Sequence, residues 1–206
     1  MNNIKNIIFD FGGVLLNIDY ALTEKAFIQL GVHNFSTLYN QHKASDLFEQ
    51  LETGKITPND FYTIFRNISN TQLSNEQIKK AWNAMLLNLP KERVQYLADI
   101  RNRYNIFLYS NTNQIHYDCF IQTANNAMPN NNFNSLFIQA YYSHICGFRK
   151  PYIESYTNIL QEQQLNPSET LFIDDTLINI QGAANAGLQV LHLQYPNTIL
   201  NLLEEL

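Results

Sequence analysis

The stretch of sequence that decides the fold is Ile-Lys-Asn-Ile-Ile-Phe-Asp at residues 4–10, which runs directly into Phe11, Gly12 and Gly13. A short apolar run ends here abruptly in an acid and a pair of glycines. Continuous apolar runs bounded by turn residues are typical of strands buried on both faces of a parallel sheet. The stretch therefore predicts a buried parallel strand whose carboxyl end carries the carboxylate of Asp10.

Two later segments repeat this design. Residues 106–109 run into Ser-Asn-Thr-Asn at 110–113, and residues 170–173 run into Asp-Asp-Thr at 174–176. In open α/β sheets, ligands bind outside the carboxyl ends of the parallel strands. We therefore expect the polar residues that follow these runs to meet at one edge of the sheet.

Helical patterns separate the later strands. Apolar residues recur at helical spacing over 151–165, with Pro151 at the expected first helical position and Asn-Pro at 166–167 as the stop. A helix of small residues at 178–186 and a strand at 189–193 follow the last polar cluster. This alternation predicts the α/β class, with a doubly wound, Rossmann-like parallel sheet.

The region between the first strand and the second reads differently, because it is far longer than a normal connection and mainly helical. Helix starts stand at 57–60 and 74–77, each with a capping hydroxyl and an acid in the first turn. We interpret this region as a small helical cap over a pocket. The predicted domains are an α/β core of residues 1–16 and 89–206 and a cap of residues 17–88.

Composition and charge exclude several classes of protein. Of the 206 residues 45% are hydrophobic, which is ample for a core. The net charge of −5 argues against a nucleic-acid partner, and no apolar stretch has the roughly 18 residues that a membrane-spanning helix needs. Without a signal peptide, we expect a cytoplasmic monomer or homodimer in which Cys119 and Cys146 are reduced thiols.

Groups that suit a metal ion and a phosphate gather at the predicted strand ends. Asp10 and the pair Asp174 and Asp175 offer carboxylates from two strands, a donor set that suits Mg²⁺. Ser110 and the amides after it suit a phosphate oxygen at a helix start, and Lys150 offers a point charge to the same phosphate. Each residue alone reads as a turn or a helix cap, so the prediction rests on their convergence.

Four ordered motifs span nearly the whole chain: Ile7-Ile8-Phe9-Asp10-Phe11-Gly12-Gly13-Val14-Leu15, Leu108-Tyr109-Ser110-Asn111-Thr112, Arg149-Lys150-Pro151 and Phe172-Ile173-Asp174-Asp175. Together they resemble the motifs of the haloacid dehalogenase-like (HAD) hydrolases, most of which are phosphatases with an aspartate nucleophile. The insertion after the first motif is similar to the helical C1 cap of subfamily IA. Within that group the motifs look most similar to those of the alpha-D-glucose-1-phosphate phosphatases, which implies a sugar 1-phosphate as substrate.

The resemblance implies a role for each motif residue in hydrolysis of a small phosphorylated metabolite. Asp10 would attack phosphorus and become a transient aspartyl-phosphate. Ser110, the Asn111 backbone amide and Lys150 would bind the phosphoryl oxygens. The Mg²⁺ ligands implied are Asp10, the backbone carbonyl of Gly12 and Asp175, with Asp174 in support.

The sequence departs from the family pattern at Gly12, where the phosphatases usually carry a second aspartate that acts as general acid and base. Two alternatives therefore stay open: a metal-independent 2-haloacid dehalogenase, and a non-catalytic protein that binds a phosphometabolite. The paired Asp174 and Asp175 favour a metal and argue against the dehalogenase. Asp19 or another side chain of the cap is a candidate substitute for the missing acid.

Two further residues are His116, shortly after the second motif, and Arg149, the first residue of the third. Both are candidates for the lining of the same cleft. Isolated residues of these types more often have supporting or surface roles, and this is the interpretation we favour for both.

Overall fold

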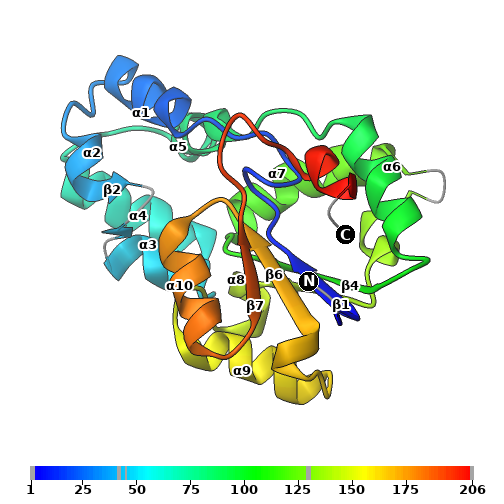
Figure 1. Cartoon of the computed structure of the whole chain (residues 1–206). Helices are drawn as coiled ribbons and strands as arrows, with labels where there is room; N and C mark the ends of the chain where they lie inside the picture. Colours follow the sequence, from blue (N-terminus) through cyan, green and yellow to red (C-terminus); the bar gives the residue numbers. More distant parts are fainter. Residues whose placement is uncertain (1–2, 41–42, 45, 129–130, 205–206) are drawn as a thin grey trace.

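A computed structural model describes residues 3–40, 43–44, 46–128 and 131–204. Its centre is a five-stranded sheet in the order β5-β4-β1-β6-β7, in which every pair of neighbours is parallel (Figure 1). The predicted α/β class and parallel sheet are therefore confirmed. The strands are β1 (Asn6–Phe9), β4 (Asn105–Ser110), β5 (Gln139–Tyr142), β6 (Thr170–Asp174) and β7 (Gln189–His192).

The register of the three central strands places their carboxyl ends side by side. Phe9 of β1 pairs with Leu108 of β4 on one side and with Ile173 of β6 on the other. The backbone N–H of Asp10 then donates to the carbonyl of Ile173 at 2.9 Å. Asp10, which follows β1, and Asp174, which ends β6, therefore lie at the same edge of the sheet.

The two faces of the sheet are covered by different helices, because successive residues of β1 point to opposite faces. Ile7 and Phe9 pack with apolar residues of α6 (Lys91–Ile100) and α7 (Gln114–Asn126). Ile8 packs with residues of α9 (Ile153–Glu162) and α10 (Leu177–Asn185) on the other face. This three-layer arrangement leaves only the edges of the sheet open (Figure 1).

Three details differ from the sequence prediction. Helix α9 begins at Ile153, after the cap residue Tyr152, so Pro151 precedes the helix rather than opening it. Strand β5 was not predicted, because Gln-Ala-Tyr-Tyr is short and lacks an apolar run. Strand β7 ends at His192, one residue before the expected end.

Four shorter helices complete the core: α8 (Ser143–Cys146), η2 (Phe133–Leu136), η3 (Pro167–Glu169) and η4 (Ile199–Glu204). Cys119 and Cys146 are both unpaired, as expected for reduced thiols. Within the described part of the chain, no helix has the length and apolar character required to cross a bilayer.

The region between β1 and β4 folds into helices around its own aromatic core. Rings of Phe27, Phe35, Phe48, Phe65 and Trp82 contact one another there. This separate core supports our proposal that residues 17–88 form a cap domain. Its elements are α1 (Tyr20–Gln29), α2 (Phe35–Leu38), β2 (Tyr39–Asn40), β3 (Lys43–Ala44), α3 (Asp46–Glu52), α4 (Pro58–Ser69), α5 (Asn75–Trp82) and η1 (Asn83–Met85).

Both helix starts expected in this region are present as capping boxes. The Thr57 hydroxyl accepts from the backbone N–H of Asp60 at 3.2 Å, and the Asp60 carboxylate accepts from the backbone N–H of Thr57 at 3.0 Å. Ser74 and Gln77 make the same reciprocal pair at the start of α5. The residue types therefore fixed these two helix ends correctly.

The cap touches the core closely at Gly54, just after α3. Gly54 has φ of +66°, and a Cβ at this position would collide with the backbone carbonyl of His144 in α8. Gly31 has φ of +90° as well, but a Cβ there would meet nothing within 4 Å. The two glycines therefore share a left-handed backbone and differ only in the contact with the core.

We predict that Gly54→Ala lowers the free energy of unfolding by about 3 kcal/mol or more, because it adds a clash to the backbone strain. Gly31→Ala, the matched control, should lower it by about 1 to 2 kcal/mol, from the strain alone. Urea denaturation of the two variants measures both values. Equal losses in the two variants would mean that the cap does not press on the core at Gly54.

Candidate active site

The polar residues of the three strand ends converge on one buried lysine. The Nζ atom of Lys150 donates to Oδ1 of Asp10 at 2.6 Å and to Oδ2 of Asp174 at 2.7 Å. Lys150 is 1% exposed and Asp174 is fully buried. Residues 140 and 24 positions away from Lys150 in sequence thus share its ammonium group.

Negative charge is in excess at this point. Burial raises the pKa of Asp10 to about 8; the attraction of Lys150 opposes the rise, and repulsion from Asp174 and Asp175 adds to it. Burial by itself would lower the pKa of Lys150, but the two acids that it contacts raise it above its usual value. When all three acids are ionised, three carboxylates against one ammonium leave two negative charges for a cation to balance.

The three acids are close enough to share one metal ion, since one ligand atom of each lies within 4.8 Å of the others. Asp174 is already engaged, because its Oδ1 accepts from the backbone N–H of Thr176 at 2.7 Å and from Nδ2 of Asn179 at 3.1 Å. Within the described residues, the carboxylate of Asp175 accepts one hydrogen bond, from the Thr176 hydroxyl at 3.3 Å. Asp10 and Asp175 therefore have the more available oxygens, and Asp174 supports them.

The glycine pair of the first motif leaves room for this acid cluster. Gly13 has φ of +77°, and a Cβ at this position would collide with the carboxylate of Asp175. The carbonyl of Gly12 accepts no backbone hydrogen bond from the described residues, so it is free to act as a ligand. This set of hard oxygen donors fits Mg²⁺.

Asn111 positions Lys150 rather than facing a ligand with its side chain. Its Nδ2 donates to the backbone carbonyl of Lys150 at 3.0 Å, and its Oδ1 accepts from the backbone N–H of Lys150 at 2.9 Å. Only the backbone of Asn111 is therefore left for a phosphate, as the sequence analysis expected. Ser110, the last residue of β4, is 3% exposed and lies beside it.

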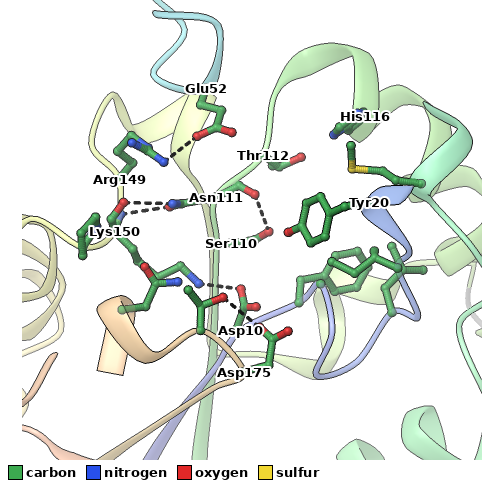
Figure 2. Close-up of a pocket in the computed structure, with 18 of the residues that line it drawn as sticks. Asp10, Tyr20, Glu52, Ser110, Asn111, Thr112, His116, Arg149, Lys150 and Asp175 are labelled. Carbon is green, nitrogen blue, oxygen red and sulfur yellow. Dashed lines mark hydrogen bonds and ion pairs between the residues drawn. The ribbon is translucent and has the colours of Figure 1, made fainter. Parts of the chain in front are cut away.

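A cavity of about 390 Å³ lies between the sheet edge and the cap. Figure 2 shows Asp10, Lys150 and Asp175 at one end, with Ser110 and Asn111 along the wall. These five predicted site residues thus line the same cavity. Asp174 lies behind them, paired with Lys150.

A model of the haloacid dehalogenase-like hydrolases matches residues 4–187. The chain belongs to the haloacid dehalogenase-like hydrolase family. A D-ribitol-5-phosphate phosphatase of Bacteroides thetaiotaomicron is 30% identical over 188 residues, which cover 90% of each chain. A sesquiterpene phosphatase of Aspergillus oryzae is 30% identical over 190 residues, which cover 92% of this chain and 89% of the relative.

Solved structures of HAD enzymes have the same architecture. A HAD family enzyme of Bacteroides thetaiotaomicron, in complex with magnesium and inorganic phosphate, matches with a TM-score of 0.86 at 30% identity, over 97% of this chain and 99% of that one. An L-2-haloacid dehalogenase of Xanthobacter autotrophicus matches with a TM-score of 0.57 at 15% identity, over 92% of this chain and 77% of that one. The likeness to the dehalogenase extends to the fold alone.

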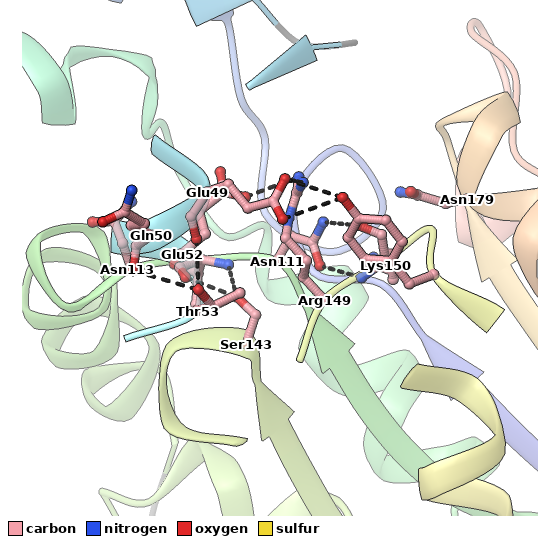
Figure 3. A network of polar contacts seen from close by, with 12 residues as sticks. Glu49, Gln50, Glu52, Thr53, Asn111, Asn113, Ser143, Arg149, Lys150 and Asn179 are labelled. Atoms are coloured by element: carbon pink, nitrogen blue, oxygen red, sulfur yellow. Dashed lines mark hydrogen bonds and ion pairs between the residues drawn. The ribbon is translucent and has the colours of Figure 1, made fainter. Parts of the chain in front are cut away.

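At the other end of the cavity of this HAD hydrolase, Arg149 ties the core to the cap. Its Nη1 lies 3.3 Å from Oε2 of Glu49, and its Nη2 lies 3.0 Å from Oε2 of Glu52 (Figure 3). Both acids belong to α3. Sequence reasoning did not find them, because no motif marks them and their partner is about 100 residues away.

His116 is a second tie between cap and core, although it also lines the cavity. Its ring stacks on Trp82 with centroids 4.7 Å apart, and its Nε2 lies 3.1 Å from the carbonyl of Trp82. Its Nδ1 lies 3.3 Å from Nδ2 of Asn113. Both ring nitrogens thus have protein partners, which agrees with the supporting role that we favoured.

We predict a pH-dependent contribution of His116 to stability. Burial lowers the pKa of His116 from 6.5 to about 4 in the folded protein, so between these values the unfolded chain binds a proton that the folded one does not. The stability of the wild type relative to His116→Gln should therefore fall by about 2 kcal/mol from pH 7 to pH 5. Urea denaturation of both proteins at the two pH values measures this difference. Parallel curves would show that the pKa of His116 is the same in the folded and the unfolded protein.

Proposed function

We propose that this HAD hydrolase is a Mg²⁺-dependent phosphatase of a small phosphomonoester, with Asp10 as the nucleophile. The observation that carries the proposal is a buried cluster of charged residues. In it Lys150 pairs with Asp10 and Asp174, and Asp10, Asp174 and Asp175 lie close enough together to share one metal ion. The relatives support it, since two are named phosphatases and a solved neighbour binds magnesium and phosphate. The partner proposed is a small phosphorylated metabolite.

In this mechanism the chain's own residues hold and transfer the phosphoryl group. A carboxylate oxygen of Asp10 forms a bond to phosphorus as the ester P–O bond breaks, which leaves an aspartyl-phosphate and an alkoxide that takes up a proton. Water then hydrolyses the aspartyl-phosphate to inorganic phosphate and restores Asp10. Lys150, the Ser110 hydroxyl and the Asn111 backbone amide stabilise the phosphoryl oxygens.

Asp10, Asp175 and the carbonyl of Gly12 are the proposed Mg²⁺ ligands, with Asp174 in support. Bound Mg²⁺ supplies charge neutralisation for the phosphoryl oxygens. Asp174 acts indirectly, because its oxygens hold Lys150, the backbone of Thr176 and the side chain of Asn179. This division of roles makes Asp175 the acid whose loss should weaken Mg²⁺ binding most directly.

The two alternatives to a phosphatase have less support. A metal-independent dehalogenase has no use for the excess negative charge around Asp175. A non-catalytic phosphometabolite-binding protein has no use for an aspartate held against Lys150 at the base of the cavity. Hydrolysis of an aryl phosphate, halide release from a 2-haloacid and ligand binding without turnover separate the three.

The leaving group is a further proposal. The motif resemblance favours a sugar 1-phosphate, whereas the named relatives act on D-ribitol 5-phosphate and on a sesquiterpene phosphate. Apart from the shared phosphate, a polyol offers hydroxyls along its chain, whereas a terpene is mainly hydrocarbon. The walls of the cavity must therefore decide between them.

The position of the missing general acid is apolar. A Cβ added at Gly12 would lie 3.1 Å from Cδ1 of Ile18. Asp19 does not replace the acid, because its carboxylate accepts from the backbone N–H of Ala21 at 2.9 Å and caps α1. The hydroxyl of Tyr20 points into the cavity, and burial raises its pKa well above the usual value, so it remains a hydrogen-bond donor (Figure 2).

We predict that the purified protein hydrolyses p-nitrophenyl phosphate only with Mg²⁺ and that Asp10→Asn lowers kcat by on the order of a thousandfold or more. The amide is nearly isosteric with the carboxylate but is a far poorer nucleophile. Phosphate release before and after EDTA treatment, with Mg²⁺ added back, measures both effects. Thermal unfolding of Asp10→Asn provides the check that the variant is folded.

Asp175→Ala and Asp174→Ala form a matched pair for the same assay. Asp175→Ala should raise the Mg²⁺ concentration for half-maximal activity, and Asp174→Ala should mainly lower the melting temperature, because it leaves buried Lys150 with one partner. Full activity in EDTA would remove Mg²⁺ from the proposal, and release of halide from a 2-haloacid would replace the proposal by the dehalogenase. Full activity of folded Asp10→Asn would remove the proposed nucleophile.

We predict that kcat/KM depends steeply on the acidity of the leaving group. Gly12 offers no carboxylic acid, and Ile18 occupies the space beside it. The departing oxygen therefore leaves with more negative charge. A positioned general acid is typically worth about 10² to 10⁴ in rate. Aryl phosphates and anomeric sugar phosphates should therefore react faster than primary alkyl phosphates. A series of substituted aryl and alkyl phosphates measures the slope.

A flat series would show that another group donates the proton. Tyr20 is the residue to test in that case, since its hydroxyl faces the cavity (Figure 2). Tyr20→Phe would then restore a steep slope. A steep slope in the wild type that Tyr20→Phe leaves unchanged agrees with the absence of a general acid.

A further inference from the structure

The end of the cavity opposite Asp10 is polar, although it lies beneath an aromatic cap core. Glu52, the last residue of α3, places a carboxylate there that is only 7% exposed. Figure 2 shows Glu52 and Arg149 at this end, with Tyr20 to one side in the view. A carboxylate buried away from the reacting atoms is unfavourable unless it has partners.

The two oxygens of Glu52 have different surroundings. Oε2 faces Nη2 of Arg149 at 3.0 Å. Oε1 makes no hydrogen bond to any residue in the described ranges, and Figure 2 shows the oxygen that is not paired with Arg149 directed into the cavity. Among the described residues nothing fills this acceptor position, which is left for a ligand or solvent.

Glu49, one turn earlier on α3, lacks this property. Its Oε2 accepts from Nη1 of Arg149 at 3.3 Å, and the Tyr152 hydroxyl lies 3.1 and 3.2 Å from its two oxygens (Figure 3). Both of its oxygens thus have protein partners. Glu49 serves to hold the cap against the core, whereas Glu52 has an acceptor to spare.

The charges at this end of the cavity restrict the kind of leaving group. Two carboxylates against one guanidinium leave a net negative charge, which repels a second phosphate or a carboxylate. The same net negative charge attracts an ammonium group, so the charges disfavour anionic leaving groups only. A hydrocarbon would cover the free oxygen of Glu52 without giving it a partner, which is costly.

Among uncharged groups, a hydroxyl is the one that suits the Glu52 end of the cavity. It donates to a carboxylate oxygen and accepts from a phenol, and the phenols of Tyr20 and Tyr39 line the same cavity. Burial raises the pKa of both tyrosines, so that their hydroxyls stay protonated and can donate. A leaving group with several hydroxyls can therefore be satisfied at more than one point.

We propose that Glu52 is a specificity-determining residue, whose free Oε1 accepts a hydrogen bond from a hydroxyl of the leaving group. On this basis the enzyme selects hydroxylated phosphomonoesters of the sugar and polyol class over hydrocarbon or anionic ones. The inference rests on the proposed phosphatase function and adds the leaving group to it.

The experiment compares ribitol 5-phosphate, pentyl phosphate and p-nitrophenyl phosphate with Mg²⁺, in the wild type, Glu52→Met and Glu49→Met. The first two substrates share a five-carbon chain and differ in hydroxyls. Glu52→Met should lower kcat/KM for ribitol 5-phosphate by about 10- to 100-fold, because a charge-assisted hydrogen bond is lost, and should leave pentyl phosphate unchanged or faster. Glu49→Met should lower kcat/KM for all three substrates alike, by less than about fivefold.

Several results would overturn the inference and leave the phosphatase intact. One is a wild type that hydrolyses p-nitrophenyl phosphate yet prefers pentyl phosphate, or a carboxylate analogue of the same length, to ribitol 5-phosphate. Another is a folded Glu52→Met variant that loses activity toward all three substrates equally. This result would give Glu52 the same structural role as Glu49. The wild-type preference must hold even if Glu52→Met does not fold. Absence of turnover with every substrate and Mg²⁺ would instead reject the proposed function itself.

Discussion

The two ion pairs of Lys150 are the constraint on which the rest of this HAD hydrolase depends. Neighbouring parallel strands in register bring Asp10 and Asp174 to the same buried edge, so the sheet itself forces two like charges together. In a medium of low polarity such a pair would take up a proton or separate. One ammonium group, contacted at 2.6 and 2.7 Å, favours the charged form of Asp10 and offsets the repulsion between the two acids. The proposed nucleophile is thus held in place because a third segment of chain closes over the strand ends.

The position of Lys150 depends in turn on Asn111, which bonds both backbone groups of the lysine. Asn111, which the second motif marks as phosphate-binding, therefore also holds the backbone of Lys150, the cation paired with Asp10. Such a fixed backbone leaves the lysine little freedom, so the ammonium group is preorganised rather than recruited by substrate. The second and third motifs act as one unit, although 39 residues separate them.

The core could be predicted from sequence because its signals are local. The run before Asp10, the capping hydroxyls at Thr57 and Ser74 and the polar ends of β4 and β6 each depend on residues next to them in the chain. The cavity wall could not be predicted, because Glu52 meets Arg149 only after the cap has folded onto the core. Strand β5 was missed for a related reason, since pairing with β4 rather than its own composition makes it a strand.

The chemistry and the choice of leaving group lie at opposite ends of the cavity, but adjacent residues link them. Arg149 bonds the cap acids and is followed directly by Lys150, which bonds the nucleophile. A displacement of α3 that broke the arginine contacts would act on the peptide of Lys150, and the Asn111 side chain resists that displacement. The cap can therefore vary its contacts with a leaving group while the phosphoryl site keeps its geometry. This arrangement explains how relatives of one fold, at the same 30% identity to this chain, can be phosphatases of a polyol and of a terpene.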